Sequence, residues 1–165
     1  MYTEGSLGCG RTAWRSRDAV ATIIPADGCI DVILRGDDVH LAGPSTVCIP
    51  TSPDVGETVG IRFAPGLAAG VLRFNPAEVR DLAAPLRDVV GAIRAAEVAR
   101  VLRVLRSFGT APGADLLTSP ADCWAGLVRR AAAAGAGAAQ VAGEIGWSTR
   151  HLRRRMLATF GYGYG

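Results

Sequence analysis

The chain has 165 residues, enough for one domain of ordinary size or two small ones. Hydrophobic residues make up 49% of it, which supports a packed core and excludes wholesale disorder. All 18 basic residues are arginine, and the net charge is only +3. Residues 1–137 carry 14 arginines and 14 acids, whereas residues 138–165 carry four arginines and one acid. The whole positive excess therefore lies in the last segment, which is typical of a surface that contacts a polyanion.

The cysteines and the hydropathy of the chain indicate the cellular compartment in which it folds. Cys9, Cys29, Cys48 and Cys123 stand far apart, and none belongs to a C-x-x-C pair. We therefore expect small buried side chains in a reducing compartment, with no metal site and no cofactor. The N-terminus has no apolar signal core, and no stretch reaches the roughly 18 apolar residues of a membrane span. These features predict a soluble, cytoplasmic protein with no membrane partner.

The first part of the chain predicts a β-rich unit. Residues 1–17 are polar and rich in glycine, which predicts a flexible N-terminal arm. Short β-type runs follow at 19–24, 29–34, 39–42, 47–49 and 59–63. Asp27 next to Gly28 is interpreted as a turn, and residues 35–38 as the turn of a hairpin.

After Phe63 the pattern changes to helices. Pro65 and Gly66 are predicted to open a short helix that runs to about Leu72, and Asn75 to cap a helix that begins at Pro76. Residues 92–108 have helical spacing of their apolar side chains, which are Val98, Val101, Leu102, Leu105 and Phe108. This pattern predicts a packing helix, and a second use of residues 92–108 in a homodimer is left open.

Residues 110–118 have no periodicity and are interpreted as a linker. Ser119 and Pro120 then form a good helix start, and Gly135 and Gly137 end that helix. The predicted class is α+β: a flexible arm at 1–17, a β-rich domain with C-terminal helices at 18–109, the linker at 110–118, and an all-α segment at 119–165.

The last segment has the pattern of two short helices joined by a tight turn. Ala138, Val141, Ala142 and Ile145 form one inward stripe, and Leu152, Met156 and Phe160 form the next. Between them, Gly146 suits a left-handed turn, Trp147 can fill the corner, and Ser148 can cap the second helix. The spacing predicts a helix-turn-helix.

The second of these helices, residues 149–160, has an arginine face. Arg150, Arg153 and Arg154 fall on one side, away from the apolar stripe. Guanidinium groups can grip guanine edges or phosphate oxygens, and a helix start can hold a phosphate. The predicted DNA-binding residues are Ser148, Thr149, Arg150, His151, Arg153 and Arg154. A solvated arginine face without a partner would explain the charge but not the spacing of the preceding turn.

Residues 138–161, A-A-Q-V-A-G-E-I-G-W-S-T-R-H-L-R-R-R-M-L-A-T-F-G, resemble the first helix-turn-helix of the AraC family of bacterial transcription regulators. The positions that match the family pattern are Ala142, Gly146, Ser148, Leu152 and Gly161, and Met156 stands where a phenylalanine is usual. The resemblance implies that Arg150, Arg153 and Arg154 occupy base-reading positions. The implied function is sequence-specific DNA binding by a transcription factor.

The front half is similar to the sensor domain that precedes such DNA-binding domains, through residues 25–34, 42–44, 60–66 and 82–88. This similarity implies a small β-rich domain that can bind a small-molecule effector. The family continues with a linker helix and a second helix-turn-helix, whereas this chain ends at residues 161–165. We therefore expect DNA binding that is weak and sensitive to salt.

Two other interpretations stay open. The chain could be a sensor or dimerisation module that no longer binds DNA and acts through protein–protein contacts. It could also be an enzyme that uses Asp27, Asp31 and His40, but these residues include no nucleophile–base pair. We expect no enzymatic activity.

Overall fold

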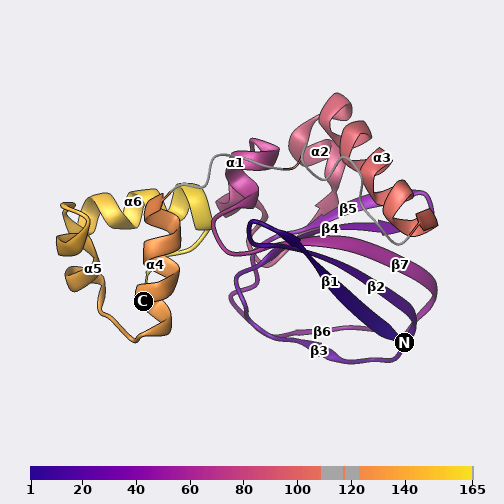
Figure 1. Cartoon of the computed structure of the whole chain (residues 1–165), viewed down its shortest axis with the longest axis horizontal. Helices are drawn as coiled ribbons and strands as arrows, with labels where there is room; N and C mark the ends of the chain where they lie inside the picture. Colours follow the sequence, from indigo (N-terminus) through magenta and orange to yellow (C-terminus); the bar gives the residue numbers. More distant parts are fainter. Residues whose placement is uncertain (109–116, 118–122, 165) are drawn as a thin grey trace.

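The structure is a computed structural model that describes residues 1–108, 117 and 123–164. It contains a sheet with helices packed on it and, beside these, a small helical bundle formed by the end of the chain (Figure 1). Each part has its own cluster of buried apolar side chains. The architecture is α+β, as predicted. None of the helices among the described residues is long and apolar enough to cross a membrane.

The main sheet has six antiparallel strands in the spatial order β1-β2-β7-β4-β5-β8. The strands are β1 (Tyr2–Gly8), β2 (Arg11–Ala19), β4 (Ile30–Arg35), β5 (Asp38–Ala42), β7 (Asp54–Phe63) and β8 (Ala83–Pro85). Two short strands, β3 (Ile23–Ile24) and β6 (Ile49–Pro50), pair with each other in a separate ribbon. The predicted turn between β4 and β5 is confirmed, since Arg35 pairs with Asp38.

The first 17 residues correct the prediction of a flexible arm. They form β1 and most of β2, and β2 pairs with β7 along most of its length. The glycines of this segment have low β-propensity, so the sequence gives a weak strand signal there. The segment is stabilised as a strand because it pairs with β7, some 45 residues away in the chain. The predicted strand at 19–24 is also wrong in part, because β2 ends at Ala19 and only residues 23–24 return to strand geometry.

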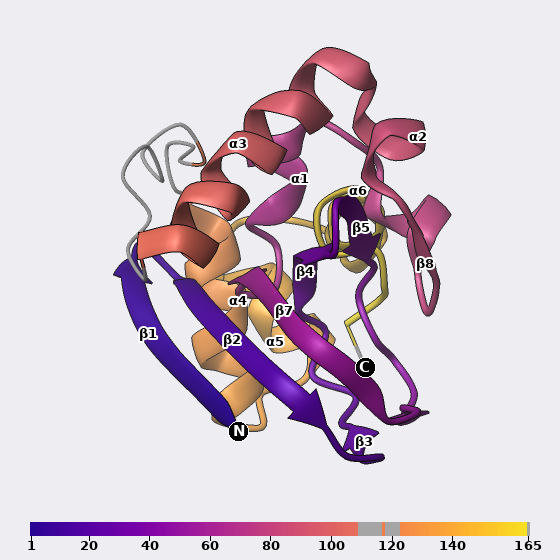
Figure 2. The same cartoon turned by 90° about the vertical axis from the view of Figure 1, so that its right-hand side faces the viewer.

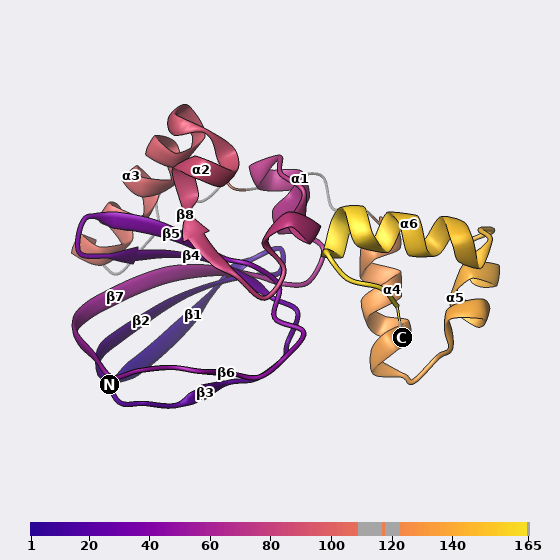
Figure 3. The ribbon, with the colours of Figure 1, turned by 180° about the vertical axis from the view of Figure 1, so that it is seen from behind.

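The two faces of the sheet differ in chemistry because side chains alternate along each strand. One face carries buried apolar side chains, such as Val32, Leu34, Val59 and Ile61. They pack against buried side chains of α1 (Ala68–Leu72), α2 (Leu86–Val90) and α3 (Ala92–Phe108). Figure 2 shows these helices on one side of the sheet. The opposite face carries polar side chains, and the β3–β6 ribbon lies on that side, away from α2 and α3 (Figure 3).

The helix α3 has the predicted bounds, and its apolar stripe packs on the sheet, as predicted for a packing helix. Val98, Val101, Leu102 and Leu105 are buried in the core of the sheet unit. A dimer through residues 92–108 would therefore need the opposite face of the helix, on which Ile93 is 82% exposed.

Between the sheet unit and the bundle, Asn75 caps a 3-10 helix, η1 (Pro76–Val79), where its Oδ1 accepts a hydrogen bond from the N–H of Ala77 at 3.2 Å. The predicted linker and the predicted helix start at Ser119 lie outside the described residues. Leu117 is the exception, and its side chain is 1% exposed and belongs to the core of the sheet unit.

Candidate nucleic-acid interface

The last three helices build a bundle around the predicted apolar stripes. They are α4 (Cys123–Ala133), α5 (Ala138–Glu144) and α6 (Thr149–Phe160). The core of this bundle is formed by Ala125, Val128, Val141, Ala142, Leu152, Met156 and Phe160. Two helices therefore lie where the spacing predicts them. Their identification as a DNA-binding helix-turn-helix stays a prediction.

The turn between α5 and α6 has the predicted parts. Gly146 has a φ of 71°, in the left-handed region that favours glycine. The N–H of Trp147 donates to the carbonyl of Ala142 at 2.8 Å, and its ring centroid lies 5.2 Å from that of Trp124 on α4. Ser148 caps α6, since its hydroxyl oxygen accepts from the N–H of His151 at 3.2 Å. These contacts set the direction in which α6 leaves the turn.

Three of the four arginines on α6 are exposed. Arg150, Arg153 and Arg154 all point to solvent, as the sequence predicts. Arg155 differs, because its guanidinium carbon lies 5.3 Å from the ring centroid of Trp124 and 5.9 Å from that of Trp147. This cation–π stacking holds Arg155 against the bundle. One of the four arginines of residues 138–165 therefore packs within the bundle and does not face solvent with the other three.

Two backbone N–H groups at the start of α6 take no part in the hydrogen bonds of the helix. The first intrahelical bond runs from the N–H of Leu152 to the carbonyl of Ser148 at 2.9 Å. Ser148 takes the N–H of His151, so the N–H groups of Thr149 and Arg150 precede the helical ladder. These donors and the helix dipole favour an anion at this end of α6.

His151 lies differently from its predicted role as a DNA contact. Its ring is half-buried, with its centroid 4.5 Å from that of Trp147. Its Nδ1 lies 3.3 Å from Nη2 of Arg154, so the neutral ring can accept a hydrogen bond there. In this geometry His151 positions Arg154.

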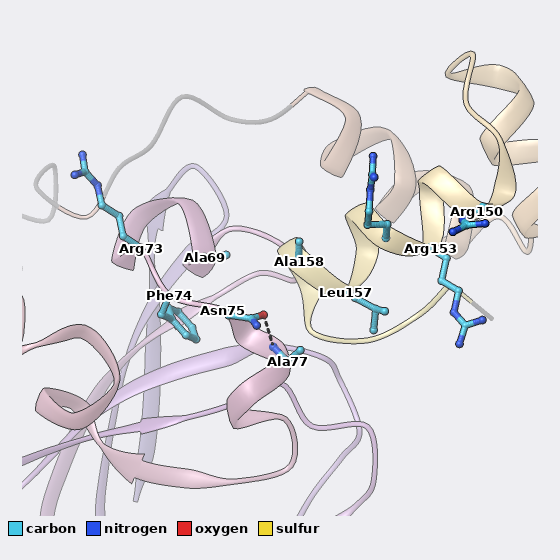
Figure 4. A pocket seen from close by; sticks show the side chains of 10 residues that line it. Ala69, Arg73, Phe74, Asn75, Ala77, Arg150, Arg153, Leu157 and Ala158 are labelled. Atoms are coloured by element: carbon cyan, nitrogen blue, oxygen red, sulfur yellow. Dashed lines mark hydrogen bonds between the residues drawn. The ribbon is translucent and has the colours of Figure 1, made fainter.

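The arginine face of α6 borders a groove of about 910 Å³, whose opposite wall belongs to the sheet unit. The groove is lined by Ala69, Arg73, Phe74, Asn75, Ala77, Arg150, Arg153, Arg154, Leu157 and Ala158. Leu157 and Ala158 lie at the end of α6 nearest α1, and Arg150 and Arg153 lie farther along the helix (Figure 4). Of the described residues that line the groove, four are arginines and none is acidic. The sequence predicts three of these arginines, and only the fold adds Arg73.

Close packing joins the end of α6 to the sheet unit. A side chain at Gly66 would meet the Phe160 ring at 2.8 Å, and one at Gly161 would meet the backbone of Pro76 at 2.9 Å. Nη1 of Arg129 on α4 also donates to the carbonyl of Pro65 at 2.7 Å. The bundle therefore contacts the loop before α1 and the start of η1, a docking that no local pattern predicts.

The three residues considered for an enzyme lie elsewhere, on or beside the sheet. Asp27 is a turn residue, as interpreted, and its Oδ1 accepts from the N–H of Cys29 at 2.9 Å. Asp31 on β4 binds the side chains of Trp14 and Arg62. His40 lies on β5, half-buried, and pairs with Ile33 and Pro85 in the sheet. The structure brings Asp27 and Asp31 together around Arg62.

Comparison with known proteins gives no match, since no family model, no curated protein and no solved structure matches this chain.

Proposed function

We propose that this chain is a DNA-binding protein whose contact element is α6. The observation that carries the proposal is the groove beside α6, which has four arginines and no acid among the described residues that line it. A concave surface with one sign of charge attracts a polyanion more strongly than scattered charges do. DNA is the polyanion for which a helix with exposed arginines is suited, because the major groove admits an α-helix.

The contacts divide by their position on α6. Arg150, Arg153 and Arg154 face outward from the helix and reach base edges or phosphates. Ser148 and the N–H groups at the start of α6 hold one backbone phosphate. Arg73, on the opposite wall of the groove, binds a phosphate of the same duplex. The resemblance to the AraC family supports the finer proposal of a transcription regulator.

The test is the affinity of the intact chain for duplex DNA, measured by fluorescence anisotropy over a range of salt concentrations. We expect Arg150→Ala and Arg154→Ala to weaken binding, by about 1–3 kcal/mol where the arginine grips a base. Each phosphate contact that is lost lowers the slope of log affinity against log salt by about 0.9. We expect Arg73→Ala to lower this slope without changing the preference for sequence.

The matched control is Arg100→Ala, which removes the same charge from an exposed position on α3. If the intact chain does not bind DNA at low salt, the proposal is refuted. It is also refuted if Arg100→Ala weakens binding as much as Arg150→Ala, because the effect would then depend on net charge alone.

A protein–protein role is the second candidate, and the outer face of α3 favours it. Ile93 is exposed there next to Arg94, which pairs with Glu97 at 2.6 Å. A homodimer through this face would place one apolar side chain in a charged rim, which is typical of a small interface. Sedimentation of the chain, and of the variant Ile93→Glu, tests it. A chain that is monomeric at every concentration removes this candidate.

A further inference from the structure

A cavity of about 440 Å³ is lined by side chains from the polar face of the sheet and from the β3–β6 ribbon, and among the described residues it shares no lining residue with the groove beside α6. Its volume is within the range of about 300–1,000 Å³ that small-molecule sites occupy. Apolar side chains form much of its wall, including Trp14, Ile24, Ile33 and Ile49. The cavity therefore combines an apolar wall with a few polar groups, as binding sites for small molecules do.

The polar groups of this cavity centre on Arg62, which is held by two carboxylates. Nε and Nη2 of Arg62 donate to Asp31, each at 3.2 Å, and Nη1 lies 3.5 Å from Oδ2 of Asp27. Two negative groups thus surround one positive group. The balance is similar over the whole lining, because Asp54 and Asp81 also belong to it and Arg35 is the other arginine. Four carboxylates against two guanidinium groups leave an excess of negative charge.

An aromatic surface lies beside these carboxylates. Nε1 of Trp14 donates to Oδ1 of Asp31 at 2.7 Å, which fixes the ring next to the acid. The ring also lies against Gly60, where a Cβ would come within 2.5 Å of it, so glycine is required there. The ring of Tyr2 stacks on Trp14 with centroids 6.3 Å apart. A π-face next to carboxylates that outnumber the guanidinium groups beside them is a surface that attracts an organic cation.

The pKa shifts of two groups in the cavity wall agree with a negative, poorly hydrated environment. Burial, and then the charge of Asp27, raises the pKa of the Cys29 thiol to about 12. Burial also raises the pKa of Asp31 above its ordinary value, although Arg62 and Trp14 offset part of this effect. A largely buried ion pair adds little net stability, so its presence in the wall of a cavity favours a role in binding.

We propose that this cavity binds a small organic cation, with its ammonium group facing Asp27 and Asp31 and its apolar body against Trp14 and Ile33. The excess carboxylate supplies the attraction, and the indole ring adds a cation–π contact. An anion of the same size would meet two carboxylates next to the one guanidinium group, so the site selects by sign of charge.

The test uses three soluble probes with one apolar body and different head groups: phenethylamine, hydrocinnamate and phenethyl alcohol. Calorimetric titration of the unaltered chain measures the affinity for each. We expect saturable binding of phenethylamine, and affinities at least about tenfold lower for the neutral and the anionic probe, since one surplus charge at an effective dielectric constant near 20 is worth more than a factor of ten. Competition between phenethylamine and tetramethylammonium is also expected.

The matched variants are Asp27→Asn and Asp37→Asn, which remove the same charge. The asparagine at 27 keeps an oxygen that can accept from the N–H of Cys29, and Asp37 is exposed in the turn between β4 and β5. We expect only Asp27→Asn to weaken phenethylamine binding, by about tenfold. The proposal is overturned if no probe binds, if hydrocinnamate binds as well as phenethylamine, or if Asp27→Asn binds phenethylamine like the unaltered chain. The three probes decide the sign of the head group even if this variant does not fold.

Discussion

Replacing Arg62 by methionine tests the ion pair in the wall of the sheet cavity. The substitution keeps an unbranched apolar side chain in place of the aliphatic part of Arg62 and removes the guanidinium group that binds Asp31. The Asp31 side chain is only 12% exposed, so its charge would be left with Trp14 as its remaining hydrogen-bond partner. Asp31 must then either stay charged in a poorly hydrated place or take up a proton, and both outcomes lower the free energy of unfolding.

The expected loss follows from the burial of the two side chains. Removal of one partner of a buried pair costs about 3–5 kcal/mol, and the 34% exposure of Arg62 reduces this value to about 2–3 kcal/mol at neutral pH. The pKa of Asp31 is already raised by burial, and loss of Arg62 raises it further. A raised pKa stabilises the folded state in acid and loses this effect as the pH rises, so the cost of Arg62→Met should shrink by at least about 1 kcal/mol between neutral pH and about pH 4.

Urea unfolding followed by circular dichroism at both pH values measures this difference. The control is Arg35→Met, because Arg35 makes a 2.9 Å ion pair with Asp54 but is 63% exposed. We expect Arg35→Met to change stability by less than about 1 kcal/mol. Equal effects of the two substitutions, or a cost of Arg62→Met that does not depend on pH, would refute the reasoning.

Three further predictions concern packing and titration. Leu152→Ala should destabilise the helical bundle by about 2–5 kcal/mol, measured by thermal unfolding, since Leu152 is fully buried there; a cost below 1 kcal/mol would show that α6 is not packed as described. Gly60→Ala should cost about 1–3 kcal/mol in urea unfolding, because the added methyl group would displace Trp14, whereas Gly5→Ala should cost less, because a Cβ at Gly5 meets nothing within 4 Å. Cys9 and Cys48 are exposed, so the expectation that they are buried is wrong. Cys29 should resist iodoacetamide at neutral pH while Cys48 reacts, read by mass spectrometry, because burial raises the pKa of Cys29 to about 12. This raised pKa also stabilises the folded state fully below about pH 9, and the stabilisation is lost as the pH rises toward 12; equal labelling of the two cysteines would contradict the assignment.

Local patterns were sufficient where an element depends on its own residues. The bounds of α3 follow from the spacing of Val98, Val101, Leu102 and Leu105, and those of α6 follow from the cap at Ser148 and the stripe of Leu152, Met156 and Phe160. Helix periodicity and capping act within a few residues, so they can be read directly from the chain. The exposure of Arg150, Arg153 and Arg154 follows from the same periodicity.

Long-range pairing decided the features that local patterns missed. Residues 1–17 become strands because β7, far along the chain, pairs with β2. Arg73 joins the arginines of α6 because Phe160 and Gly161 pack on the sheet unit, and Asp31 meets Trp14 and Arg62 because β2, β7 and β4 are neighbours in space. The sequence by itself determined α3, α5 and α6, the cap at Ser148 and the location of the positive charge. Only the tertiary structure decided the N-terminal strands, the groove and the cavity, because each depends on contacts between residues that are distant in the chain and close only after folding.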